Sequence, residues 1–177
     1  MITPNKLPEE IVSLLQPRLR DELTQYARYT AMANWCRGVG YEKAAAFYEK
    51  DASEELEHAQ RLMKFLVDWN IIPSYPSIVA PRTTFDSLTA TIEEAYKFEF
   101  KLYEDYEDTS ARVFEAGDMC TFDFLQQYRT IQRTTVAEYS DKLNMLEGVV
   151  DREPEEGEER ERECKVDMLL LEEKLFG

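Results

Sequence analysis

SEELEHAQRLMKFL, residues 53–66, carries the pattern that decides the fold. Apolar residues recur in it every three or four positions, which is the repeat of one face of an α-helix. Glu55 and His58 lie three positions apart beside that apolar face, and His58 is the single histidine of the chain. Its imidazole is a surface group, a satisfied core group or a metal ligand, and the residues on the other helices decide among these three.

The composition narrows the class of protein. The chain has 36 acidic and 21 basic residues, a net charge of −15, and a pI near 4.5, which argues against nucleic acid as a partner. Cys36, Cys120 and Cys164 form no C-x-x-C pair, which is typical of reduced thiols. The first residues lack signal-peptide features, and no apolar run reaches the roughly 18 residues of a membrane span. We therefore expect a cytoplasmic protein with no membrane association.

Four long periodic segments predict an all-α, up–down four-helix bundle. The first and second segments are separated by glycines, and so are the third and fourth, so each pair should be antiparallel. The connection IIPSYPSIVAPRTT, residues 71–84, has three prolines and can run the length of the bundle as a crossover. The expected helices span residues 7–37, 41–70, 84–116 and 121–148.

The chain divides into three predicted parts. Residues 1–150 form the four-helix domain, and residues 151–165 form an acidic linker for which the sequence gives no role. Residues 166–177, VDMLLLEEKLFG, predict a short apolar fifth helix at the C-terminus. This helix needs a surface on which to bury its leucines, such as a partner subunit.

Each apolar face contains one carboxylate or carboxamide near its middle: Glu22, Glu55, Glu99 and Gln132. Three buried carboxylates with no Lys or Arg on the same faces favour a bound cation. The alternative, that the faces are rotated and the acids lie in solvent, is weaker because four positions coincide. Both helix pairs also have the same spacing of 33 residues between these positions.

This combination resembles the ferritin family, in which a four-helix bundle carries a di-metal carboxylate site. The segments that carry the resemblance are DELTQYARYTAMANW, SEELEHAQRLMKFL, TIEEAYKFE, FDFLQQYRTIQ and the terminal short helix. The second helix has Glu55-x-x-His58, whereas the fourth has Gln132-Arg133-Thr134-Thr135. This asymmetry resembles ferritin itself rather than bacterioferritin, Dps, rubrerythrin or ribonucleotide reductase.

The resemblance implies a ferroxidase centre that oxidises Fe²⁺ with O₂ or peroxide. Glu22, Glu55 and His58 would hold the tighter iron, and Glu55 would bridge to a looser iron held with Glu99 and Gln132. Tyr29 would lie beside the centre. Hard carboxylates with one imidazole suit iron(II). The family's 24-subunit shell and stored ferric mineral are implied in the same way.

Other residues carry weaker expectations. Glu54 and Glu57 resemble acids that face the mineral cavity, although a solvated helix face is an equal alternative. Asp123 matches one acid of the three-fold iron channel, while Gln126 replaces the second. Leu56 stands where bacterioferritin has its axial Met, so we expect no haem.

Two other functions stay open from the sequence. One is a ferritin-like diiron oxidase or detoxifying protein without substantial mineral storage. The other is a structural bundle without catalysis. The size of the assembly and the rate of Fe²⁺ oxidation distinguish these functions from storage.

Overall fold

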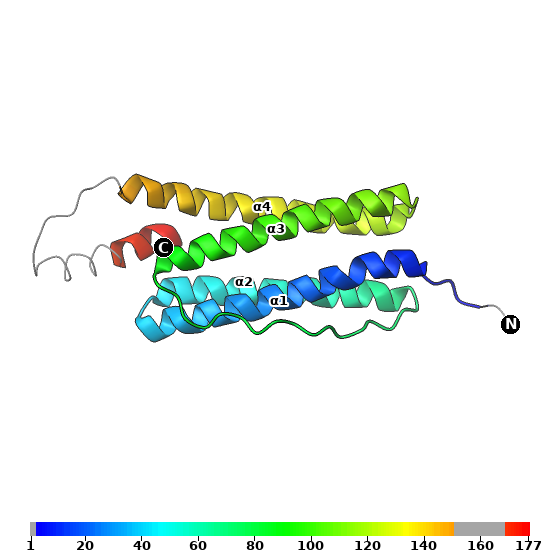
Figure 1. Cartoon of the computed structure of the whole chain (residues 1–177), viewed down its shortest axis with the longest axis horizontal. Coiled ribbons are helices and arrows are strands. Elements are labelled where there is room, and N and C mark those ends of the chain that lie inside the picture. Colours follow the sequence, from blue (N-terminus) through cyan, green and yellow to red (C-terminus); the bar gives the residue numbers. More distant parts are fainter. Residues whose placement is uncertain (1–2, 151–168) are drawn as a thin grey trace, which may run out of the picture.

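The computed structural model describes residues 3–150 and 169–177, and within these ranges every regular element is a helix. Helices α1 and α2 form one antiparallel layer, and α3 and α4 form the other (Figure 1). The all-α, up–down four-helix bundle expected from the sequence is confirmed. The long helices are α1 (Glu9–Val39), α2 (Glu42–Asp68), α3 (Leu88–Glu115) and α4 (Met119–Val150).

The connection between α2 and α3 runs along the bundle as the predicted crossover, beside α1 (Figure 1). It lets α3 begin at the same end of the bundle as α2. No helix in the described part of the chain is long and apolar enough to cross a membrane.

Glycines and a serine set the helix ends. Gly40 and Gly117 have positive φ angles of 96° and 75°, where a residue with a Cβ atom would be strained. The expected start of α3 near Thr84 and Asp86 was a few residues early. Ser87 is the N-cap, because its hydroxyl accepts a hydrogen bond from the Ala90 amide at 3.0 Å.

Two details of α1 differ from the sequence-based expectation. Prolines are expected where helices stop, but Pro17 lies inside α1. The spacing of three and four residues that places Glu22 on the buried face also predicts Tyr26 there, but Tyr26 is 37 % exposed and Gln25 is 3 % exposed. The buried face of α1 passes through Gln25 and Tyr29, which are four residues apart and therefore lie one above the other.

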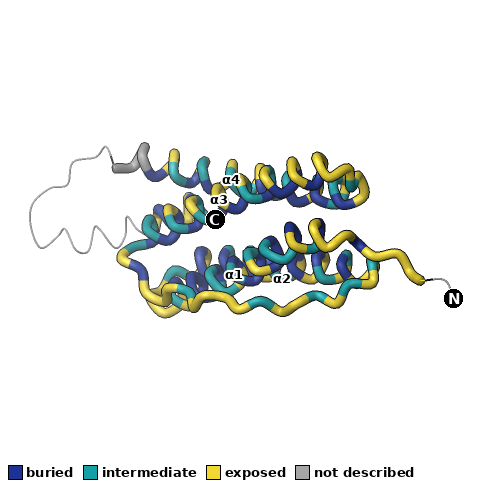
Figure 2. The backbone as a smooth tube through the Cα atoms, turned by 45° about the vertical axis from the view of Figure 1, so that its right-hand side comes forward, coloured by how far each residue is buried: buried dark blue, intermediate teal, exposed yellow. Residues whose placement is uncertain are grey.

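The apolar core has two parts, and the predicted ligands lie between them. The buried faces of the helices point inward along the whole bundle (Figure 2). One cluster includes Tyr29, Ala52, Ala95 and Tyr139, and the other includes Leu23, Ala59, Leu102 and Tyr128. On α2, α3 and α4 the segments between the clusters contain Glu55 and His58, Glu99, and Gln132, while Glu22 adjoins the boundary on α1. The fold thus gathers one polar layer at mid-bundle.

Residues 169–176 form the short C-terminal helix, which packs on its own chain (Figure 1). Leu171 and Leu175 are buried in the core, and Lys142 Nζ donates to the Leu175 carbonyl at 3.0 Å. Leu169 and Leu170 stay exposed. The surface that this helix was expected to need is therefore supplied by its own chain for Leu171 and Leu175. Burial of its other face by a partner subunit stays a prediction.

The Glu172 side chain of this helix caps α2. Its Oε1 accepts hydrogen bonds from the amides of Lys43 and Ala44 at 2.8 and 3.0 Å. These amides belong to the first turn of α2, whose N-cap residue, Tyr41, gives no side-chain cap. The proposed division into residues 1–150, 151–165 and 166–177 stays a prediction, because residues 151–168 lie outside the described part.

Candidate metal centre

Glu22, Glu55 and His58 converge in the polar layer between α1 and α2. Each offers one ligand atom within 4.8 Å of the others, and all three are buried. The Nδ1 atom of His58 lies 3.3 Å from Oε2 of Glu22 and 3.5 Å from Oε2 of Glu55. The three-residue spacing of Glu55 and His58 puts both on one face of α2, as the sequence predicted. Two carboxylates and an imidazole are therefore arranged as a ligand cluster for a divalent cation.

Glu99 reaches the same layer from α3 and is fully buried. Its Oε1 accepts a hydrogen bond from the Tyr29 hydroxyl at 2.5 Å and another from Gln25 Nε2 at 3.0 Å. Tyr29 is thus beside the centre, as the resemblance implied. Its ring stacks between Tyr48 and Tyr139, with centroid distances of 5.9 and 6.2 Å. Two donors from α1 therefore hold one oxygen of the α3 carboxylate.

Tyrosines from the opposite pair of helices support the cluster. The Tyr106 hydroxyl donates to Oε1 of Glu22. The Tyr128 hydroxyl donates to the backbone carbonyl of His58 at 2.9 Å. Both rings are almost fully buried and stack on each other with centroids 5.1 Å apart. Tyrosines of α3 and α4 therefore restrain Glu22 on α1 and the backbone at His58 on α2.

One atom of every predicted ligand is buried without a hydrogen-bond partner. A buried polar atom without a partner costs about 1–3 kcal/mol, and a native fold keeps few of them. Here five occur together in one layer. They are Glu22 Oε2, Glu55 Oε2, His58 Nδ1, Glu99 Oε2 and Gln132 Oε1. The donor set fits divalent cations, and Glu22, Glu55 and His58 are close enough to share one ion.

The pKa values of the buried carboxylates also favour a bound cation. Burial, and then the neighbouring Glu22 and Glu99 carboxylates, raise the pKa of Glu55 well above its ordinary value. Burial raises the pKa of Glu99 from 4.5 to about 7, opposed by the hydrogen bond from Tyr29. Clustered carboxylates thus resist ionisation in the metal-free chain. A bound cation would reverse this preference.

The remaining predicted residues lie elsewhere. Glu54 and Glu57 are exposed on α2 and pair with Lys50 and Arg61. Asp123 is exposed in the second turn of α4. The structure does not bring these acids to the centre, and their roles at a cavity or a channel stay predictions.

Sequence reasoning missed the residues that orient the ligands. Gln25 lies three positions after Glu22, and Asp51 lies four before Glu55, so helical spacing could have placed both near the layer. Asp51 accepts a hydrogen bond from Tyr139 at 2.7 Å, and burial raises its pKa to about 7. The apolar repeat of α3 predicts Tyr106 as a core residue, and no local pattern reveals its hydroxyl contact.

Comparison with known proteins identifies the class. The family model of the ferritin-like domain matches residues 12–149. This chain therefore belongs to the ferritin family.

Individual relatives agree with this assignment. The chain is 31 % identical over 143 residues to a "Probable bacterial non-heme ferritin-like protein" of Haemophilus influenzae, covering 79 % of this chain and 87 % of that protein. It is 28 % identical over 146 residues to a bacterial non-heme ferritin of Escherichia coli O157:H7, covering 82 % and 84 % of the two chains. Among solved structures, an open pore ferritin from the archaeon Archaeoglobus fulgidus is similar with a TM-score of 0.83 and 21 % identity, covering 96 % of each chain. That structure supports the fold.

Proposed function

We propose that this chain is an iron-storage ferritin that oxidises Fe²⁺ at an asymmetric centre within each subunit. The observation that carries the proposal is the set of five buried, unpartnered ligand atoms contributed by Glu22, Glu55, His58, Glu99 and Gln132. The relatives named as non-heme ferritins support the same assignment.

The ligand types explain how the two positions would differ. Glu22, Glu55 and His58 give one Fe²⁺ two carboxylates and an imidazole. Glu55, Glu99 and Gln132 give a second Fe²⁺ a shared carboxylate, another carboxylate and a neutral amide. Three carboxylates with two Fe²⁺ leave one net positive charge, and the weak amide ligand leaves the second ion loosely held.

The residues around the ligands would prepare the site for oxidation. Tyr106 donates a hydrogen bond to one oxygen of Glu22, and Tyr29 donates to one oxygen of Glu99. The other oxygen of each carboxylate would therefore be available to iron. The apolar clusters on both sides exclude bulk water. Two Fe²⁺ supply two electrons to O₂ or peroxide, and loosely held Fe³⁺ then leaves for a ferric mineral in a hollow shell of 24 subunits.

Stopped-flow measurement of aerobic Fe²⁺ oxidation tests the centre. We expect Glu22→Ala and His58→Ala to lower the initial rate by at least the 10–100-fold typical of lost supporting contacts. Glu104→Gln, which removes an exposed carboxylate of α3, is the matched control and should keep the rate. Undiminished rates in both alanine variants would disprove the centre.

Assembly size and turnover separate storage from the alternative of a diiron oxidase. Light scattering should show a shell-sized particle, whereas a dimer-sized particle would rule out storage. Gln132→Glu should tighten the second position and slow iron turnover. Unchanged turnover in that variant would contradict the role of Gln132.

A further inference from the structure

Glu99 is held by a hydrogen-bond chain that begins at the protein surface. Arg28 Nη1 donates to Gln25 Oε1 at 2.9 Å, and Gln25 Nε2 donates to Glu99 Oε1 at 3.0 Å. Gln25 is 3 % exposed, while Arg28 is partly exposed and lines a pocket of about 520 Å³ between α1, α3 and the crossover. The chain therefore connects an outer pocket to a buried carboxylate.

Arg28 sets the direction of the Gln25 amide. A guanidinium has only donors, so the amide oxygen must face Arg28. The amide NH₂ group then faces Glu99, which is an acceptor. Without Arg28, no donor would fix the amide oxygen of Gln25 on the side facing position 28. The arginine thus makes Gln25 a donor at the metal centre.

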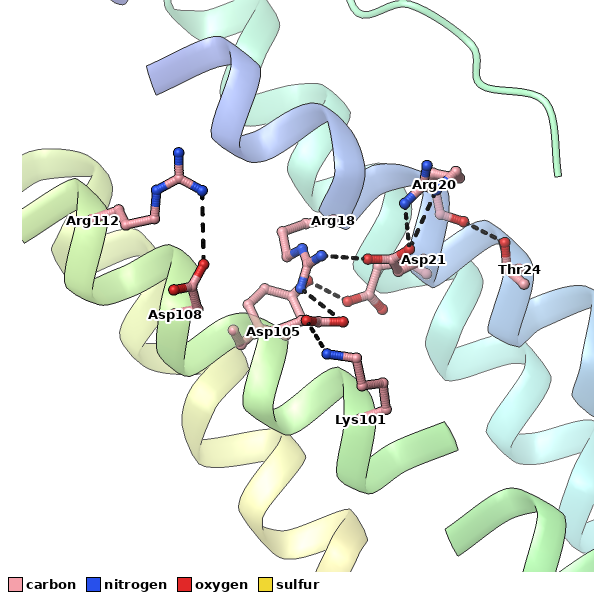
Figure 3. Close-up of polar contacts among 10 residues, drawn as sticks. Arg18, Arg20, Asp21, Thr24, Lys101, Asp105, Asp108 and Arg112 are labelled. Carbon is pink, nitrogen blue, oxygen red and sulfur yellow. Dashed lines mark hydrogen bonds and ion pairs between the residues drawn. The ribbon is translucent and has the colours of Figure 1, made fainter. Parts of the chain in front are cut away.

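Nearby carboxylates are paired with other cations. Glu94, the carboxylate that acts most strongly on Arg28, lies 3.5 Å from Arg82 Nη1. The carboxylates nearest the pocket, Asp21 and Asp105, pair with Arg18, and Lys101 also pairs with Asp105 (Figure 3). Within the described residues Arg28 makes no ion pair within 4 Å of a carboxylate. Its guanidinium instead lies over the Phe98 ring, 3.4 Å from the centroid. Stacking on Phe98 and the hydrogen bond to Gln25 therefore fix its position.

The chain also decides which oxygen of Glu99 is available. Gln25 and Tyr29 both donate to Oε1, while Oε2 is buried and accepts no hydrogen bond. Two donors from different directions on one oxygen restrain rotation of the carboxylate. Oε2 is left as the oxygen that an ion can bind.

We infer that Gln25, held by Arg28, is a positioning residue that prepares Glu99 for the looser of the two metal positions. The inference rests on the proposed two-metal function. The position built from Glu22, Glu55 and His58 contains neither Glu99 nor a contact to Gln25. Loss of the chain should therefore weaken one metal and spare the other.

Anaerobic titration with Co²⁺, followed by calorimetry and by absorption of the bound ion, tests the inference. We expect Gln25→Leu to weaken the second Co²⁺ by about 10–100-fold, the range seen when ligand-orienting contacts are lost. The first Co²⁺ should change by less than about threefold. Equal weakening of both ions, or no change in either, would overturn the inference.

Variants of Arg28 test the direction of the amide. Arg28→Glu offers the amide oxygen an acceptor in place of a donor. The Gln25 amide then has acceptors on both sides and loses the contact that fixed its oxygen, so its NH₂ group should no longer be held on Glu99. The second ion should then be weakened as strongly as in Gln25→Leu. Arg28→Lys keeps a donor and should stay close to the unmodified protein. An Arg28→Glu variant with normal binding of both ions would contradict the assigned orientation.

A double-mutant cycle separates the chain from a general charge effect. Arg28→Met should weaken the second ion in the natural background but add nothing when Gln25 is already Leu. Arg20→Met removes another positive charge of the same pocket without touching Gln25, and should leave both ions unaffected. Additive effects of Arg28→Met and Gln25→Leu would disprove the relay. Failure of the unmodified protein to bind two ions would instead disprove the proposed function.

Discussion

Replacing Glu99 by Gln should make the metal-free protein more stable at alkaline pH, although it should damage the metal centre. Burial raises the pKa of Glu99 from 4.5 to about 7. A carboxyl group whose pKa is raised by folding stabilises the native state only while it is protonated. This contribution is complete below pH 4.5 and is lost as the pH rises through 7.

The magnitude follows from the two pKa values. One pKa unit corresponds to about 1.4 kcal/mol, so the change from 4.5 to about 7 is worth about 3 kcal/mol. An amide at position 99 has no charge to desolvate, and its oxygen can still accept from Tyr29 and Gln25. For a chain of this length, that free energy corresponds to a rise of about 6–12 °C in the unfolding midpoint.

The assay is thermal unfolding of the chelator-treated protein, followed by circular dichroism at pH 5 and pH 8. The Glu99→Gln variant should unfold at a higher temperature than the unmodified protein at pH 8, with a smaller difference at pH 5. Glu104→Gln, which changes an exposed carboxylate of the same helix, should leave the pH dependence unaltered. If Glu99→Gln is less stable at pH 8, or keeps the full pH dependence, the reasoning is refuted.

Adding metal should cancel most of the stability advantage of Glu99→Gln. A ligand at 100 times its Kd stabilises the native state by about 2.7 kcal/mol. The unmodified protein should gain this stabilisation at each metal position, whereas Glu99→Gln should gain it at the position made by Glu22, Glu55 and His58. A larger metal-induced gain in the variant would contradict the assignment of Glu99 as a ligand.

Three further changes test other parts of the structure. Tyr106→Phe removes the donor to Glu22 Oε1 and should lower Co²⁺ affinity about 10–100-fold by calorimetry; unchanged affinity would show that the contact does not orient the ligand. Asp51→Asn should raise the free energy of unfolding of the metal-free protein at pH 8 by at most about 4 kcal/mol, since burial raises the pKa of Asp51 from 3.8 to about 7. This gain, measured by urea unfolding, should vanish below pH 4. Glu172→Ala removes the cap on α2 and should lower the free energy of unfolding in urea by about 1 kcal/mol. Glu173→Ala breaks only an exposed ion pair and should lower it by less. Equal losses in the two variants would argue against the cap.

Local sequence patterns were sufficient to predict the bundle and the convergence of Glu22, Glu55 and His58. Apolar residues every three or four positions fix which face of a helix is buried, and Gly40 and Gly117 fix where helices end. Glu55 and His58 share a face because both are on one helix, so their proximity follows from helical geometry alone. The exception within a helix was Tyr26, which is exposed, because the neighbouring Gln25 lies on the buried face instead.

The sequence could not predict which oxygen of each carboxylate accepts a hydrogen bond and which has none. Glu22 is held by Tyr106 across 84 positions, and Glu99 by Gln25 across 74. These contacts depend on the height and rotation of one helix against another, which side-chain packing of the whole bundle sets. The position of the C-terminal helix also depends on packing, because the surface that it contacts is formed by α2 and α4 together.

The sequence by itself therefore determined the helices, their order and which residues are candidate ligands, because these depend on spacing along single helices. Only the tertiary structure decided which oxygen of each carboxylate is occupied by a donor and which is left for an ion. That choice depends on hydroxyl and amide groups that folding brings in from distant segments. A polar layer in the core thus becomes a candidate metal centre through its supporting hydrogen bonds as much as through its ligands.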